Sequence, residues 1–203
     1  MPNWCNNSIA FYQADGGNDM LDAFYADIKK CRDYKDPATG KSSDWIGYWL
    51  ESNRVDTDTI YSRGFLSWCE MYSNYVHVDM ETAWAPLPEV YSIMAKKYNL
   101  SYVYIAEEPG SEIYVNTDSE GRFFATRYMI NSFDVECLGL DSEAEEKFGE
   151  RLREIGTDTT YYDSFAEVLD KFEGFGFNVP DLESLNKCLE VFNIEVYEYS
   201  HTQ

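Results

Sequence analysis

One alternating run of residues constrains the fold of this chain more than any other feature. Val76, Val78 and Met80 recur with a two-residue period, and His77 and Asp79 occupy the alternate positions. Because a strand directs alternate side chains to opposite faces of its sheet, one face of this segment is apolar and the other is polar. The pattern therefore predicts a half-buried strand.

A turn and a helix follow that strand. Residues 84–88 read WAPLP, and Pro88 stands where a helix can begin, because the first helical position does not need the N–H that proline lacks. Apolar residues then recur at helical spacing from Val90 to Tyr98. Three more strand-like runs follow, and we expect the last two to form a hairpin through residues 118–121. The runs cover residues 100–106, 113–116 and 123–130.

The preceding part of the chain completes the order of elements. Residues 7–13 predict a first strand, and Asn18 or Asp19 can cap a helix that has one apolar face. Residues 32–63 are mostly polar and are interpreted as an insertion, and a strand begins at Gly64. The order strand, helix, strand, strand, helix, strand is typical of ferredoxin-like domains, in which helices cover one face of an antiparallel sheet.

The composition changes after Cys137. Ser142 with Glu145, and Ser164 with Glu167, fit capping boxes that begin helices. We therefore expect an α+β protein in two parts. A ferredoxin-like domain spans residues 1–136, with an insertion at about residues 32–63, and an acidic, mostly helical extension that can end in an edge strand spans residues 137–203.

Negative charge is the second dominant feature of the chain. The 203 residues contain 37 acidic and 16 basic side chains, for a formal net charge of −21. Well over half of this excess lies in residues 134–203, which hold 18 acids and 5 bases. Such a surface repels nucleic acid and anionic membranes. It favours basic protein surfaces, divalent cations, or sites that normally hold a polyanion.

The acids of the extension predict a protein-interaction surface. On the helix that begins near Ser142, glutamates recur on the side opposite the apolar stripe, about 6 Å apart along the axis. Phosphates of a duplex strand advance about 3.4 Å per residue, so a mimic of nucleic acid needs a second row, for which the candidates are Glu145, Asp158, Asp163, Asp170 and Glu173. The alternative is an ordinary solvated helix face. The predicted surface comprises Glu143, Glu146, Glu150, Glu154, Asp158 and Asp163, with Tyr161 and Tyr162 as aromatic anchors.

The sequence predicts no catalytic, cofactor-binding or metal-binding residue. It has two histidines, His77 and His201, and His77 lies on the polar side of its strand, where a plain surface histidine is expected. The five cysteines are scattered and form no C-x-x-C pair, which argues against a disulfide framework or a zinc site. The start of the chain does not have the pattern of a signal peptide. We therefore expect a non-enzymatic cytoplasmic protein.

Three motifs carry a resemblance to a known family. Residues 1–7 read MPNWCNN, residues 79–88 read DMETAWAPLP and residues 104–110 read YIAEEPG. In this order they resemble the YubB-type ferredoxin-like proteins, which conjugative plasmids and phages carry. The resemblance covers about residues 1–131 and departs at residues 73–77, where similar proteins tend to have a tryptophan-rich strand. It implies a fold and a gene that travels on mobile elements, and no established catalytic residue.

These observations lead to a ranked set of functions. The first is a mobile-element protein that inhibits a host nucleic-acid-targeting defence enzyme, a CRISPR effector or a restriction nuclease, by occupying its basic nucleic-acid-binding surface. Such a protein binds neither nucleic acid nor membrane itself, and the sequence sets no oligomeric state. One alternative is a non-enzymatic phage or plasmid module that holds a peptide, nucleotide or RNA on its sheet. Another is a hydrolase that uses carboxylates and a divalent ion.

Overall fold

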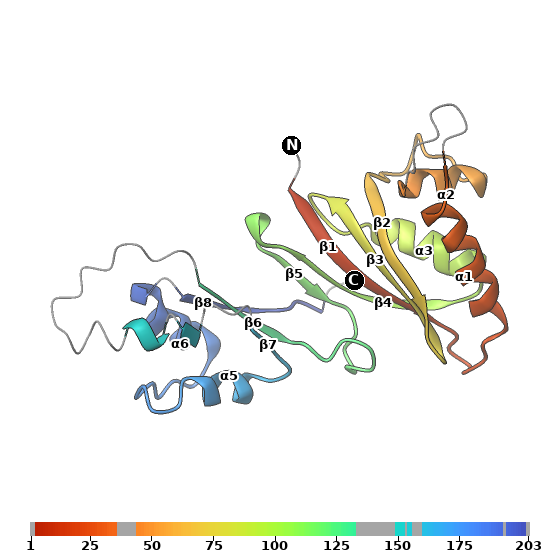
Figure 1. Ribbon diagram of the computed structural model, residues 1–203. Helices are drawn as coiled ribbons and strands as arrows, with labels where there is room; N and C mark the ends of the chain where they lie inside the picture. The colour runs from red at the N-terminus through yellow and green to blue at the C-terminus, as the bar shows by residue number, and fades with distance from the viewer. Residues whose placement is uncertain are drawn as a thin grey trace. The chain divides into compact units, whose positions relative to one another are not determined.

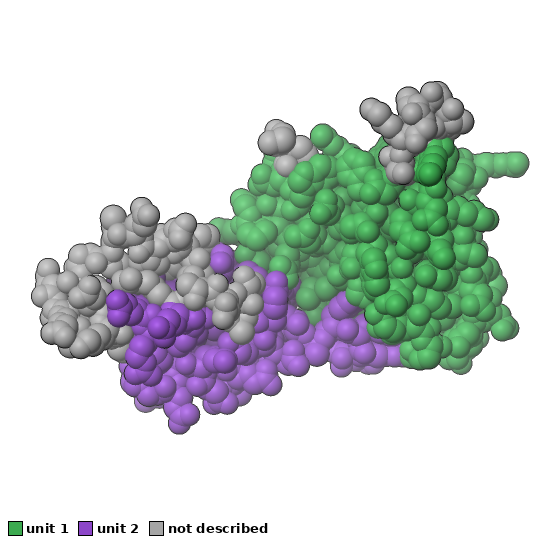
Figure 2. Space-filling view, viewed as in Figure 1, with its two compact units in different colours: residues 1–119, 201–203 green, residues 120–200 purple. Residues whose placement is uncertain are grey.

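The protein divides into two compact units. A computed structural model describes residues 3–35, 44–132, 149–152, 154–155, 160–192 and 194–201. The first unit holds residues 1–119 and 201–203, and the second unit holds residues 120–200, drawn in green and purple in Figure 2. Both units combine helices and strands, so the predicted α+β class is confirmed.

A five-stranded antiparallel sheet forms the first unit (Figure 1). The strand order across the sheet is β2-β3-β1-β4-β5, so β1 and β3 are neighbours near its centre. They pair over nine residues, from Trp4 opposite Ala83 to Tyr12 opposite Tyr75. The strands are β1 (Trp4–Tyr12), β2 (Gly64–Met71), β3 (Tyr75–Ala83), β4 (Ser101–Glu108) and β5 (Ile113–Asn116).

Helices cover one face of this sheet (Figure 1). Helix α1 has acidic residues in its first turn and basic residues in its last, which complements the helix dipole at both ends. Helix α3 begins at Pro88, as the sequence predicted. The elements of this layer are α1 (Asp19–Arg32), α2 (Ile46–Ser52) and α3 (Pro88–Lys97), and a 3-10 turn, η1 (Pro109–Ser111), follows β4.

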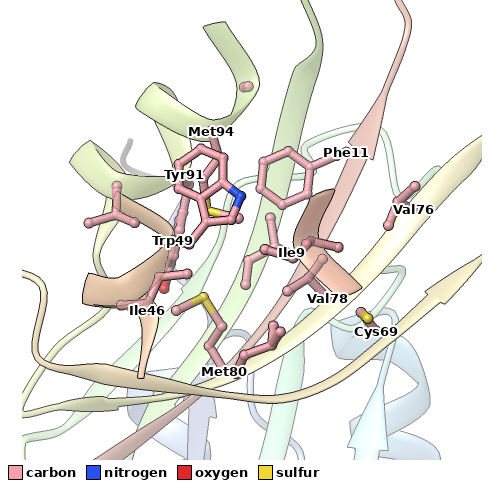
Figure 3. Close-up of a cluster of buried hydrophobic side chains, with 14 of the residues drawn as sticks. Ile9, Phe11, Ile46, Trp49, Cys69, Val76, Val78, Met80, Tyr91 and Met94 are labelled. Carbon is pink, nitrogen blue, oxygen red and sulfur yellow. The ribbon is translucent and has the colours of Figure 1, made fainter. Parts of the chain in front are cut away.

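The main core lies between the sheet and these helices. Ile9 of β1 and Val78 of β3 point into it beside Trp49 and Tyr91 of the helical layer, as Figure 3 shows. Burying side chains of this size contributes about 1.5–3 kcal/mol each. The predicted alternation of β3 is confirmed, because Val76, Val78 and Met80 are buried and the residues between them are not.

The second unit has its own sheet and core. Three antiparallel strands lie in the order β7-β6-β8, and a separate cluster of buried apolar side chains packs against them. Asp181 caps α6, and the predicted pair of Ser164 and Glu167 caps α5: the Ser164 hydroxyl accepts a hydrogen bond from the Glu167 amide. The elements are β6 (Tyr128–Ser132), β7 (Thr160–Tyr162), α5 (Phe165–Lys171), α6 (Leu182–Leu189), η2 (Glu190–Phe192) and β8 (Ile194–Glu198).

The structure corrects the expected pairing after β5. The hairpin predicted between residues 113–116 and 123–130 is wrong, because β5 pairs with β4 whereas β6 pairs with β7 and β8. Instead of a tight hairpin, the Asn116 side chain accepts a hydrogen bond from the Asp118 amide and turns the chain out of the first sheet. The second unit therefore begins at Glu120, before the boundary expected at residue 137, and its last strand joins the second sheet.

A buried amide ties β1 to β3 at the level of the core. Asn7 donates hydrogen bonds to the Thr82 hydroxyl at 2.8 Å and to the Cys5 carbonyl at 2.7 Å, and its nitrogen lies 3.2 Å from the Met80 carbonyl. The Thr82 hydroxyl donates in turn to the Ala85 carbonyl, 2.8 Å away. This chain of hydrogen bonds connects the first strand to the turn that precedes α3.

We expect Asn7→Ala to lower the free energy of unfolding by about 1–3 kcal/mol, because the variant leaves buried acceptors without their donor. Urea unfolding followed by tryptophan fluorescence measures the loss. The matched control is Asn6→Ala, which alters the exposed neighbouring side chain and should stay within about 0.5 kcal/mol of the wild type. Equal losses in the two variants would contradict the role of this network.

Candidate functional site

The described part of the predicted interaction surface lies in the second unit. Glu150, Glu154 and Asp163 are exposed, and Tyr161 on β7 is 47% exposed. Tyr162 is only 7% exposed and belongs to the core of that unit, so Tyr161 is the ring of this pair that reaches the surface. The remaining predicted residues lie outside the described residues: Glu143, Glu146 and Asp158.

Every described acid of the second unit lies at the surface. Twelve carboxylates are exposed, and the same described residues contain five basic side chains. One of these bases, Lys187, pairs with Glu183 within α6 at 2.6 Å. The remaining charge is therefore carried largely by side chains in contact with water. The twelve are Glu120, Glu150, Glu154, Asp163, Glu167, Asp170, Glu173, Asp181, Glu183, Glu190, Glu195 and Glu198.

An acidic row follows helix α5. Glu167 and Asp170 are exposed, whereas Val168 and Phe172 on the opposite side of the helix are buried in the core of the unit. Glu173 continues the row just beyond the C-terminal end of the helix. With steps of three or four residues, these carboxylates lie on one helix face. This row includes Asp170 and Glu173, which the sequence had proposed for a second line of carboxylates.

A different surface lies on the first unit, on the face of the sheet away from the helices. Aromatic and acidic side chains alternate along its β2 and β3 strands. We call this surface the β2–β3 face. It comprises Trp68, Glu70, Tyr72, Tyr75, His77 and Asp79.

A hydrogen-bonded cluster occupies the middle of the β2–β3 face. The Asp79 carboxylate accepts a hydrogen bond from the Ser8 hydroxyl at 2.6 Å, and the same oxygen lies 2.7 Å from His77 Nε2. The rings of Trp68 and Tyr72 lie edge-on to the His77 ring, at centroid distances of 5.7 and 6.5 Å. Because Asp79 lies between Ser8 and His77, the histidine cannot take the serine proton directly, and the arrangement is not that of an activated serine nucleophile.

Two opposing effects set the ionisation of Asp79. Burial raises the pKa of its carboxyl, but the hydrogen bonds from His77 and Ser8 and the electrostatic attraction of His77 outweigh burial, so the pKa is lowered overall. The carboxylate is thus held in its charged form. The sequence had placed His77 and Asp79 on one face, but it did not reveal that Trp68 and Tyr72 surround them.

A β-bulge explains why the sequence missed these neighbours. The register of β2 against β3 shifts between Leu66 and Trp68, where one extra residue enters the strand. Leu66 therefore faces the core opposite Met80, whereas Trp68 lies opposite Asp79 on the other face. A two-residue period read through this segment assigns Trp68 to the core.

Parts of the three motifs quoted above meet at one end of the sheet. Cys5 of β1 is opposite Thr82 of β3, and Asn6 of β1 is opposite Glu107 of β4. Burial raises the pKa of the Cys5 thiol to about 11, which keeps it protonated and unreactive at neutral pH. The motifs therefore build a corner of the sheet, and burial keeps their cysteine in the less reactive thiol form.

Two residues at this corner are unusual, one for its buried carboxylate and the other for its backbone conformation. Glu108 is 3% exposed; its Oε1 accepts a hydrogen bond from the Gly110 amide at 3.0 Å, and its Oε2 has no hydrogen-bond partner among the described residues. Trp84 is 49% exposed and has a φ of 70°, a left-handed conformation that is costly for a bulky residue. Both residues belong to the quoted motifs.

Metal-ligand clusters and membrane-spanning helices are both absent from the described residues. They contain no group of three or more histidine, cysteine, aspartate or glutamate side chains placed to hold a metal ion. Within the same ranges, no helix combines the length and the apolar character needed to cross a membrane.

Comparisons with known proteins add no family to these observations. Neither the family models, nor the curated proteins, nor the solved structures gave a match to this chain.

The lowered pKa of Asp79 predicts a pH dependence of stability. A carboxyl whose pKa is lower in the folded state stabilises the fold above its unfolded pKa, near 3.8, and this contribution is lost as the pH falls through the folded value. From pH 5 to pH 3, the wild type should therefore lose more unfolding free energy than Asp79→Asn. Urea unfolding at each pH measures both slopes.

The control for this experiment is Glu89→Gln, which removes one exposed carboxylate from α3 and leaves the Asp79 cluster intact. Its loss of stability over the same pH range should stay closer to that of the wild type. Parallel slopes for the wild type and Asp79→Asn would show that the hydrogen bonds of Asp79 do not lower its pKa.

Proposed function

We propose that this protein inhibits a host nucleic-acid-targeting defence enzyme, such as a CRISPR effector or a restriction nuclease, by occupying its basic nucleic-acid-binding surface. The observation that carries the proposal is the exposure of all twelve described carboxylates of the second unit. A net charge of −21 causes electrostatic repulsion within the folded chain, and binding to a partner of opposite charge relieves that repulsion. The protein acts by binding, in the cytoplasm of a bacterial cell, and needs no catalytic residue.

The acidic row of α5 supplies the geometry for such binding. Glu167, Asp170 and Glu173 present carboxylates along one side of a helix, and Glu150 and Glu154 add two exposed carboxylates on another helical segment of the same unit. Tyr161 offers an exposed ring that a cationic groove can bury. Long-range attraction between opposite charges accelerates association, and salt weakens it.

The first unit is, under this proposal, a ferredoxin-like domain similar to the YubB-type proteins of plasmids and phages. Support comes from its strand order, in which β2 and β4 flank the paired strands β1 and β3, with α1 and α3 on one face. The adjacency of the three motifs at one corner of the sheet also supports it. Strand β5 is an addition at the edge next to β4.

A competition assay tests the proposed inhibition. Labelled duplex DNA is first bound to each of several bacterial CRISPR effectors and restriction nucleases, and the protein is then added at increasing concentration. We expect it to displace DNA from at least one enzyme, at low salt more effectively than at high salt. The triple variant Glu150→Lys, Glu154→Lys, Asp170→Lys should weaken displacement about tenfold or more, because three attractive charges become repulsive.

A matched variant of the first unit controls for net charge. Glu51→Lys, Asp58→Lys and Glu89→Lys together change the total charge by the same amount at exposed positions outside the second unit. This variant should displace DNA nearly as well as the wild type. Failure to displace DNA from any enzyme, or equal weakening by the two triple variants, would count against the proposal.

A further inference from the structure

The β2–β3 face carries carboxylates and no basic side chain other than a histidine. None of the five strands of the first sheet, all of which are described, contains a lysine or an arginine. On the face away from the helices, Glu70 lies opposite His77, and Trp68 lies opposite Asp79. Glu81 continues the same side of β3. Any ligand of this face therefore meets negative charge.

The same face presents a continuous group of aromatic rings. Trp68 is 40% exposed and Tyr72 is 41% exposed, although both are large apolar groups. Tyr72 stacks on Tyr75 with a centroid distance of 4.7 Å and an interplanar angle of 5°. The edge-on contacts of Trp68 and Tyr72 with His77 join the rings into one platform. Because the rings hold one another in place, a ligand that stacks on them orders few additional side chains.

Carboxylates stand within this platform rather than at a distance from it. Glu70 of β2 lies between Trp68 and Tyr72, the residue just after the strand, and a hydrogen bond between its carboxylate and the Tyr72 hydroxyl raises the pKa of Tyr72. The Asp79 carboxylate is fixed from the other side by Ser8 and His77. A ligand stacked on the rings thus comes within reach of two oriented carboxylates.

Charge decides which planar group fits such a platform. Nucleobases stack well on the aromatic residues of a sheet, but nucleic-acid sites pair those residues with basic side chains that hold the phosphates. This sheet offers no lysine or arginine for that purpose and places Glu70 and Asp79 beside the rings. A guanidinium group stacks on aromatic faces and donates paired hydrogen bonds to carboxylates. Both features of the surface therefore favour a cation.

We propose that the β2–β3 face is a binding site for an arginine side chain of a peptide or protein partner. The guanidinium stacks on the exposed rings of Trp68 and Tyr72 and pairs with the carboxylate of Glu70 or Asp79. Lysine binds less well, because its compact ammonium neither stacks as a plane nor donates in a fork. This site belongs to the first unit and does not depend on the acidic surface of the second, so either proposal can fail without the other.

Nuclear magnetic resonance with three matched tripeptides tests this site. Acetyl-Gly-Arg-Gly-amide, its lysine counterpart and its uncharged citrulline counterpart are each titrated into the full-length protein labelled with ¹⁵N. We expect the arginine peptide to shift the Trp68 indole signal and the Tyr72 and His77 amides saturably, with a Kd on the order of 1 mM. The lysine peptide should bind about threefold more weakly, and the citrulline peptide should leave these signals unchanged.

Two variants and two matched controls complete the test. Trp68→Ala should abolish the shifts, and Glu70→Gln, which changes one exposed side chain and keeps the fold testable, should weaken binding about threefold. Trp84→Ala and Glu89→Gln alter an exposed tryptophan and an exposed acid outside this face, and both should bind like the wild type. The charge reversals in the second unit should have no effect on these signals.

Three results would overturn the inference. The first is equal binding of all three peptides. The second is a set of shifts confined to the second unit. The third is tighter binding at the Trp68 indole by a uridine dinucleotide than by the arginine peptide, which would assign the platform to nucleobases.

Discussion

The structure of the first unit depends on the burial of alternate residues of two central strands. β1 and β3 pair without interruption over nine residues, and each sends one set of side chains into the core beneath α1 and α3. Because these residues are fixed in the core, the residues that alternate with them must point to the opposite face of the sheet. The position of His77 and Asp79 therefore follows from the burial of Val76, Val78 and Met80, and the chemistry of the face is a consequence of the core.

Charge in the first unit is sorted by layer. Basic residues occur at the C-terminal turns of α1 and α3, where they complement the helix dipoles, and Lys97 also pairs with Asp27 at 2.9 Å. Burial raises the pKa of Asp27, but hydrogen bonds from Tyr98, Lys97 and Asn53 lower it further than burial raises it. These cations lie in the helical layer, whereas the five strands contain acidic residues and no lysine or arginine. The outer face of the sheet is therefore negative although it carries few acidic residues.

The sequence predicted those features that depend on neighbouring residues. The period of β3, the proline that begins α3 and the capping pair of Ser164 and Glu167 were all visible, because each is encoded within a few positions. Pairing between distant segments could not be predicted from the sequence. The assignment of β6 to a second sheet depends on partners that lie about 30 to 70 residues away, and no local pattern distinguishes that choice from a hairpin with β5. The exposure of Glu150, Glu154 and Tyr161 agrees with the predicted surface. The burial of Tyr162 could not be predicted without knowing which residues form the core of the second unit.

The bulge in β2 has a consequence for how such a surface can change. The bulge holds one extra residue, Ser67, on the same exposed side as Trp68, so the side chains that follow keep the faces that their partners on β3 require. Loss of Ser67 would restore a regular ladder and keep Trp68 and Glu70 on the outer face and Cys69 on the core face, whereas a deletion elsewhere in the strand without a new bulge would reverse these faces. The strand can therefore gain or lose a residue at the bulge while its row of outward-facing groups stays in place.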